Sequence, residues 1–195
     1  MTLTIGQAYR QSELNNYATQ FGPTAQLAVL AGTVPTDADT AATAGNIVLV
    51  GLPYTVTTPF GTASAAKPSV ITAATITTTN VYGTGTATFF RSYACSTPGI
   101  ATGNFVVGNA YLIQALGNTT TAQWQTVGLN SGLTTVTTGQ VFTATATTLA
   151  GTGTAYLLAT VEQGTVGAGS GDLNLNTVSL VAGGPLQITS LTRSM

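Results

Sequence analysis

Apolar positions follow a helical period only near the start of the chain. In QSELNNYATQF, four apolar residues are spaced as i, i+3, i+4 and i+7, which places them on one face of a helix. They are Leu14, Tyr17, Ala18 and Phe21. Ser12 is of a residue type that favours the N-cap position. The spacing predicts a short amphipathic helix that begins near Ser12 and packs either on the chain's own sheet or in a groove of a neighbouring subunit.

From Ala25 onward, apolar and threonine-rich runs alternate with clusters of turn-forming residues. Short apolar or alternating runs are typical of strands, and clusters of Gly, Pro, Asn and Asp between them are typical of turns. We expect strands within residues 25–32, 47–57, 69–83, 85–96, 155–167, 172–184 and 186–192. Many short strands at this spacing predict an all-β fold of the β-sandwich or jelly-roll type.

The stretch of residues 100–154 interrupts this series and carries an apolar set of its own. It contains the chain's only tryptophan, Trp124, and has Gly-rich turns on each side. The set suffices to pin a small β-module but is thin for independent stability. We therefore expect three regions, which are an N-terminal arm and helix (1–25), a main β-domain (26–99 plus 155–195) and an inserted β-module (100–154).

Charge is scarce in this chain. Charged residues make up 5% of it, against about 25% in ordinary soluble domains, and the formal net charge is −1. The four cations are scattered, whereas binding to a phosphate backbone needs a cluster of them. We therefore expect no nucleic-acid partner. A surface of hydroxyls and short apolar side chains fits a protein held in an assembly, with a Thr-rich extracellular β-domain as the alternative.

We expect neither a secretory signal nor a membrane span. MTLTIGQAYRQSE lacks the basic and apolar regions of a signal peptide, and no apolar run approaches the roughly 18–20 residues that cross a bilayer. The single cysteine, Cys95, excludes an internal disulfide, and we expect it to be a small buried apolar residue.

Residue types that serve catalysis or metal binding are also scarce. The chain has no histidine, and no base stands ready to activate its many Ser and Thr hydroxyls. Asp37 and Asp39 form the one close acidic pair, for which an Asx-type turn is favoured over a Ca²⁺ site. Asp172 is expected in a turn as well, with calcium bridging a trimer axis as the alternative. We predict a protein that is not an enzyme, with no catalytic residue, cofactor or metal.

Two sets of residues are candidates for interaction. On the N-terminal helix, Leu14, Tyr17 and Phe21 are candidates for a tether to a neighbouring protein. In the inserted module, we expect Tyr111 and Trp124 to form the core, and a sugar-binding platform is the alternative. An exposed Trp124 would favour sugar binding, and a buried one would favour a structural module.

Three stretches outside the insert resemble a family of small structural proteins of phage particles. They follow a short helix, in the order and spacing of that family, and are LAVLAGTVPTDADTAATAGN, TPFGTASA and QGTVGAGSGDLNLNTVSLVAGGPLQITS. The resemblance covers roughly residues 10–95 and 155–192, and the third stretch is the most specific. The insert resembles a β-module of phage structural and tail-associated proteins through VGNAYLIQALGNTTTAQWQTVG and TGQVFTATATTLAGTGTA, with departures at Asn118 and Thr138.

These resemblances imply a non-enzymatic structural protein of a phage virion, assembled in the host cytoplasm. The first expectation is a capsid decoration or cement protein that binds the outer surface of the major capsid protein and stabilises the head. It would contact neighbouring copies of itself, with a homotrimer favoured. The alternatives are a tail, collar or fibre component of the virion, or a carbohydrate-binding adhesin that acts through the inserted module.

Overall fold

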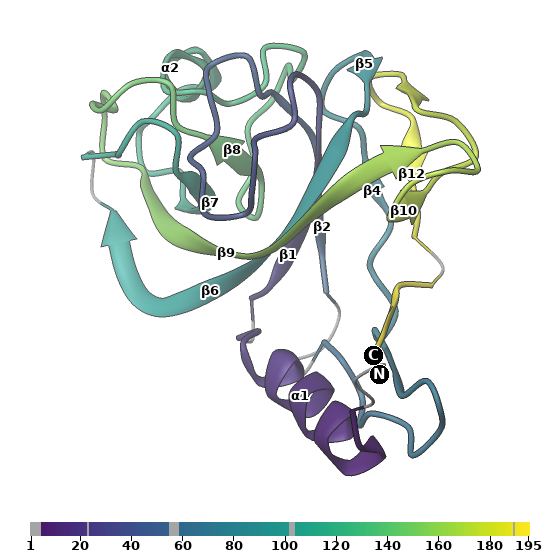
Figure 1. The fold of residues 1–195 in the computed structure, drawn as a ribbon. Helices are drawn as coiled ribbons and strands as arrows, with labels where there is room; N and C mark the ends of the chain where they lie inside the picture. Colours follow the sequence, from purple (N-terminus) through teal and green to yellow (C-terminus); the bar gives the residue numbers. More distant parts are fainter. Residues whose placement is uncertain (1–4, 23, 55–58, 102–103, 189) are drawn as a thin grey trace.

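The computed structural model describes residues 5–22, 24–54, 59–101, 104–188 and 190–195. In these ranges one twisted sheet is covered on one face by a layer of short strands, and a helix projects from the body (Figure 1). Neighbouring strands of the sheet are β2 (Val48–Pro53), β1 (Gln26–Leu30), β6 (Phe89–Ala101), β9 (Thr154–Gly167), β7 (Ala110–Ala115) and β8 (Val141–Thr143), with β10 (Leu173–Asn174) parallel to β9. The predicted all-β, sandwich-like class with a short N-terminal helix is confirmed. Residues 1–4, 23, 55–58, 102–103 and 189 of the predicted regions and strands lie outside the described residues.

Two long strands organise the main sheet. β6 has 13 residues and β9 has 14, and they pair antiparallel from Phe89↔Thr165 to Ala101↔Ala155. β1 and β2 extend the sheet beside the first half of β6, whereas β7 and β8 extend it beside the start of β9. Both long strands curve across the molecule in Figure 1, so the two ends of the sheet approach each other.

The central strands are buried on both faces. Every residue of β1 is buried, with Leu27 and Val29 in one apolar cluster and Ala28 and Leu30 in another. A strand covered on both sides carries an unbroken apolar run rather than an alternating one. This two-sided burial explains why the LAVL run at residues 27–30 is continuously apolar in the sequence.

The C-terminal segment pairs antiparallel with residues 70–86 and forms the second layer. Its ladders join β11 (Ser179–Leu180) to β5 (Gly85–Thr86), β12 (Pro185–Leu186) to β4 (Thr79–Asn80) and β13 (Thr192–Ser194) to β3 (Val70–Thr72). The register is unchanged from Ser179↔Thr86 to Leu186↔Thr79 and shifts by one residue before Thr192↔Thr72. The three ladders are therefore one long, interrupted pairing.

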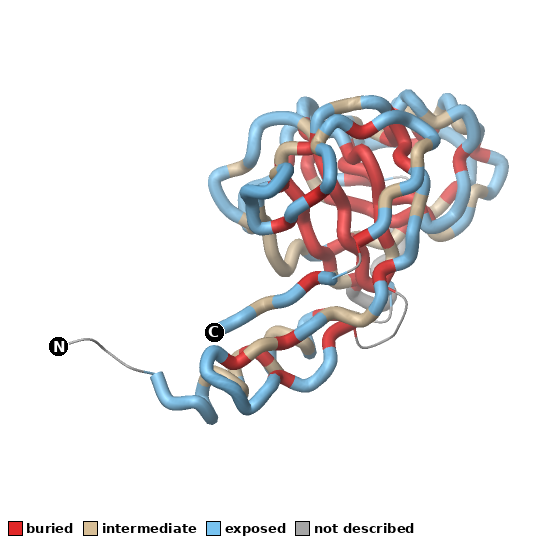
Figure 2. The backbone as a smooth tube through the Cα atoms, turned by 90° about the vertical axis from the view of Figure 1, so that its right-hand side faces the viewer, coloured by how far each residue is buried: buried red, intermediate tan, exposed pale blue. Residues whose placement is uncertain are grey.

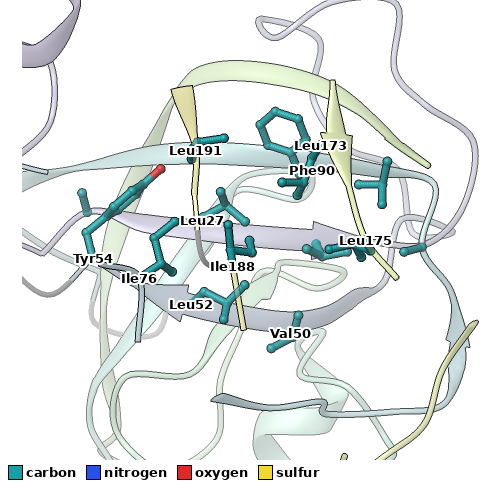
Figure 3. Packing of buried hydrophobic residues seen from close by; sticks show 14 of the residues in the cluster. Leu27, Val50, Leu52, Tyr54, Ile76, Phe90, Leu173, Leu175, Ile188 and Leu191 are labelled. Carbon is teal, nitrogen blue, oxygen red and sulfur yellow. The ribbon is translucent and has the colours of Figure 1, made fainter. Parts of the chain in front are cut away.

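This layer covers the main sheet over its largest apolar cluster, as Figure 3 shows. Side chains of the C-terminal segment lie over side chains of β1, β2 and β6. The first set is Leu173, Leu175, Ile188 and Leu191, and the second is Leu27, Val50, Leu52 and Phe90. Burying one such side chain contributes about 1.5–3 kcal/mol, so the C-terminal segment is part of the core. In Figure 2 the buried residues gather in the body of the molecule.

The predicted inserted module has an apolar cluster of its own around Trp124. The members of this cluster lie between Phe105 and Ala155. Its strands β7 and β8 nevertheless continue the main sheet beside β9. The module is thus attached through a shared sheet and not through a separate linker.

The N-terminal helix, α1 (Gln7–Thr19), begins before the predicted position. Its N-cap is Gly6, so the expectation of a start near Ser12 is wrong. Polar side chains on the first turns hold the helix to the loop that follows Phe60. Gln7 Nε2 donates to Ala65 O, Gln11 Nε2 donates to Ala63 O, and Asn15 Oδ1 accepts from Ala63 N. The residues that make these contacts are polar and add nothing to the apolar period, which is why the sequence pattern placed the start of the helix too late.

Tyr82 bridges the gap between the two ends of the main sheet. Its hydroxyl accepts a hydrogen bond from Val141 N of β8 at 3.4 Å. On the other side, a Cβ added to Gly51 of β2 would lie 2.7 Å from that hydroxyl and 2.9 Å from Val141 Cγ2. The edge strands β2 and β8 are therefore joined through the side chain of Tyr82, and the glycine at position 51 leaves the space that its hydroxyl occupies.

We expect Gly51→Ala to lower the free energy of unfolding by about 1–3 kcal/mol, the usual cost of overpacking a filled core. Chemical denaturation followed by circular dichroism measures this change. Gly61→Ala is the matched control, because a Cβ there meets nothing within 4 Å, and its denaturation midpoint should equal that of the wild type. Equal midpoints for Gly51→Ala and the wild type would contradict the bridging role of Tyr82.

Candidate interaction surfaces

The apolar stripe of α1 faces the protein's own core. Leu14 and Phe21 are buried in the largest apolar cluster, and Tyr17 packs against it. The Tyr17 ring lies edge-on to both Phe21 and Phe60, with centroids 5.2 Å apart in each case. Of the two sequence hypotheses for this helix, packing on the chain itself describes the structure. Leu14 and Phe21 are thus buried and Tyr17 is partly buried, so all three of these candidate tether residues contribute to the chain's own packing.

Other apolar side chains are exposed on the lobe that α1 forms with residues 59–73 and β13, which we call the lower lobe. Tyr9 is 57% exposed, Met195 is 45% exposed and Ile5 is 44% exposed. The chain ends beside α1 at this lobe, which projects from the body in Figures 1 and 2. A contact made by the N-terminal region would therefore use Tyr9 and its neighbours, which the helical stripe did not indicate.

A polar network ties the C-terminal strand β13 to the main sheet. Arg193 donates from Nε to Glu162 Oε2 at 2.6 Å and from Nη2 to Oε1 at 2.7 Å, a bidentate ion pair. Ser92 Oγ donates to the same Oε1 at 2.7 Å and lies 3.3 Å from the Tyr54 hydroxyl. Burial, with a smaller contribution from the Glu162 charge, raises the pKa of Tyr54 above its usual range. The Tyr54 phenol stays neutral, and the network holds β13 against β6 and β9.

The most specific stretch of the phage-family resemblance also has a structural role at each of its key residues. Asp172 Oδ2 accepts hydrogen bonds from the backbone N–H and the hydroxyl of Thr165, at 2.8 and 2.9 Å. A Cβ on Gly164 would lie 2.6 Å from the Phe90 ring. The Thr165–Asp172 clamp closes the turn and places Leu173 and Leu175 over the sheet. Asp172 is therefore a turn residue, as predicted.

Trp124 and Tyr111 lie inside the inserted module. They are 0% and 2% exposed, and both rings contact Phe142, at centroid distances of 5.6 and 5.7 Å. The Tyr111 hydroxyl accepts a hydrogen bond from Val106 N at 2.9 Å. The prediction that these residues form the module's core is confirmed by their burial. A sugar-binding platform would need at least one of these rings to be accessible.

The sequence pattern missed the helix that carries this tryptophan, α2 (Thr121–Thr126). Thr120 and Gln123 form a capping box in which each side chain accepts a hydrogen bond from the other's backbone N–H, at 3.3 and 2.8 Å. The motif Thr-x-x-Gln is visible in the sequence, and it is the signal that would have identified the helix.

The acidic pair of Asp37 and Asp39 lies in a turn. Asp37 Oδ1 accepts hydrogen bonds from the backbone N–H and hydroxyl of Thr40, both at 2.7 Å, so the favoured Asx-type turn is confirmed. Across the described ranges, no group of three or more Cys, Asp or Glu side chains could hold a metal ion. No helix in the described part of the chain is long and apolar enough to cross a membrane.

A scan against protein-family models, a search of curated proteins and a search of solved structures each returned no match. Function is therefore inferred from the chain's own residues and from the resemblances noted in its sequence.

The Thr165–Asp172 clamp predicts a specific acid dependence of stability. The hydrogen bonds from Thr165 lower the pKa of the Asp172 carboxyl, so this contribution is present above the unfolded-state value of about 3.9 and is lost as pH falls through the lower folded value. We expect Asp172→Asn to reduce the free energy of unfolding at pH 7 by about 0.5–1 kcal/mol, a small value because the carboxyl is exposed and screened. The variant should also lose less stability than the wild type below pH 4, by denaturation at several pH values. In the double variant with Thr165→Val, the two losses should not add, and additive losses would refute the clamp.

Burial of Trp124 predicts its fluorescence. The emission should be blue-shifted from that of free tryptophan and resistant to acrylamide quenching, and denaturant should remove both properties. Trp124→Ala should cost about 3–5 kcal/mol of stability, as for large buried aromatic residues. Emission at the position of free tryptophan, together with quenching by acrylamide in the folded protein, would show that the ring is exposed and would reopen sugar binding.

Proposed function

We propose that this chain is a non-enzymatic structural protein of a phage particle, and specifically a capsid decoration or cement protein. The observation that carries the proposal is the QGTVGAGSGDLNL stretch, the most specific part of the phage-family resemblance. Its residues form the Thr165–Asp172 clamp and place Leu173 and Leu175 in the core. The defined structural roles of Thr165, Asp172, Leu173 and Leu175 are the reason why we base the proposal on this stretch.

The surface of the protein supports association with neighbours. Charged residues make up 5% of the chain, and exposed apolar side chains such as Tyr9, Val106 and Val181 are spread over it. Shallow contacts of this kind become strong when symmetry repeats them in a closed oligomer and on a regular shell. We propose the outer surface of the major capsid protein and other copies of this chain as the partners. A homotrimer is the oligomer that we favour.

The alternatives differ in how well they are supported. A tail, collar or fibre component of the virion is compatible with the resemblance of the inserted module to phage tail-associated proteins. A carbohydrate-binding adhesin is less well supported, because Trp124 and Tyr111 are buried and would need to be exposed to stack on a sugar.

The stoichiometry of the protein in purified phage particles tests the proposal. We expect one copy per major capsid subunit, or one per three, by quantitative mass spectrometry with isotope-labelled peptides from both proteins. Peptides of a known tail protein provide the control for a component present in few copies. A ratio of a few per hundred would replace decoration by a tail, collar or fibre role, and absence from the particle would refute a virion role altogether.

A further inference from the structure

Arg91 is a buried cation whose hydrogen-bond partners are all neutral. It lies near the start of β6 and is 3% exposed. Its Nε donates to Gln163 Oε1 at 2.9 Å, and its Nη2 donates to the carbonyl oxygens of Thr40 and Asp37, at 2.7 and 3.4 Å. Within the described ranges the one ion pair closer than 4.0 Å joins Arg193 to Glu162. The charge of Arg91 is therefore buried without a carboxylate beside it.

The hydrogen bonds of Arg91 to Gln163, Asp37 and Thr40 use Nε and Nη2, and among the described residues none is found from Nη1. Tyr93 lies within reach of the same guanidinium, whose charge lowers the pKa of the Tyr93 hydroxyl against the larger, raising effect of burial. A buried charge held only by neutral groups is costly, and a carboxylate is the group that best offsets it. The planar fork of arginine binds a carboxylate through two parallel hydrogen bonds. The Nη1 donors are thus suited to such a partner.

A recess of about 280 Å³ opens beside Arg91. Its walls come from the loop at residues 38–41, the start of β7 at 108–110, and residues 157–160 of β9. The side chains that line it are mostly small or apolar, and Asn109 and Thr160 add neutral groups capable of hydrogen bonding. The volume suits a single side chain or a small anion rather than an extended ligand.

Two aspartates lie near the recess, and neither forms an ion pair with Arg91 within 4.0 Å. The Asp37 carboxylate accepts hydrogen bonds from Thr40, and the charge of Arg91 makes only a small contribution to lowering its pKa, while the Asp37 backbone carbonyl accepts a hydrogen bond from the guanidinium. Asp39 lines the recess and is exposed to solvent, but it forms no ion pair with Arg91 within 4.0 Å. Val106 and Val107, which directly precede the lining residue Gly108, are exposed. Apolar side chains beside an arginine are common at the centres of protein interfaces.

We propose that this recess binds a carboxylate, and that the carboxylate belongs to an Asp or Glu side chain of a partner protein in the particle. The identity of the partner rests on the proposed function, whereas carboxylate binding does not. The partner's carboxylate accepts hydrogen bonds from Arg91 Nη1, and its surroundings pack on Val106 and Val107. The contact supplies specificity on a surface that is otherwise poor in charge.

Nuclear magnetic resonance of the ¹⁵N-labelled protein tests this site. The matched probes are N-acetyl-aspartate N-methylamide and N-acetyl-asparagine N-methylamide, which differ in charge at nearly constant shape, at fixed ionic strength. We expect the aspartate compound alone to produce a saturable shift of the Arg91 Nε–Hε signal and of the Gly108 and Asn109 amides. The Arg193 signal is the internal control and should not move, because its guanidinium already holds Glu162. Arg91→Gln should weaken binding at least tenfold.

Equal shifts with both compounds, or no saturable shift with either, would overturn the site. Acetate is the third probe, and binding of acetate without binding of the blocked aspartate would mean that the recess takes a free small carboxylate and not a partner's side chain. If Arg91→Gln does not fold, the comparison of the two compounds on the wild type decides the question alone. A low copy number in particles would refute the proposed function and leave this titration unaffected, and a failed titration would leave the stoichiometry result unaffected.

Discussion

Burial of β1 and of the first residues of β6 on both faces is the constraint on which the rest of the structure depends. Phe90 lies in one apolar cluster, and Phe89 and Tyr93 lie in the other. Both faces of β6 are therefore shielded from water at these residues. One face is covered by the C-terminal segment and residues 70–86. The other is enclosed by the curvature of the sheet itself, which brings β2 close to β8 through Tyr82. The second layer buries one apolar face of the sheet, and the near closure of the sheet buries the other.

Burial raises the free-energy cost of leaving the few charged residues on the long strands unpaired. Glu162 on β9 would be costly in such surroundings without a partner, and it receives a bidentate one from Arg193. The ion pair therefore fixes where β13 lies as well as offsetting the charge. Arg91 on β6 donates hydrogen bonds to neutral oxygens and lies over the Phe89 ring. The two arginines therefore differ, because only Arg193 has a carboxylate within 4.0 Å among the described residues.

The elements that the sequence predicted well are those specified by local pattern. The apolar run at β1, the Asx-type turn at Asp37 and the core position of Trp124 follow from residue type and spacing, and the structure confirms each of them. The start of α1 was missed because glutamine side chains, which have no apolar period, anchor its first turns. The Arg91 recess could not be predicted, because it joins segments at 38–41, 108–110 and 157–160 that only the folded sheet brings together.

Low surface charge shapes how such a protein can recognise a partner. Steering by long-range fields needs clustered charge, and nine scattered charged residues do not provide it. In the proposed decoration role, affinity would come from many weak contacts repeated by symmetry, which bind strongly but discriminate poorly. A single desolvated arginine in a small recess would add discrimination between partner surfaces. A surface without a correctly placed carboxylate would leave the arginine's charge uncompensated. Repetition would set the strength of attachment, and Arg91 would select the surface that receives it.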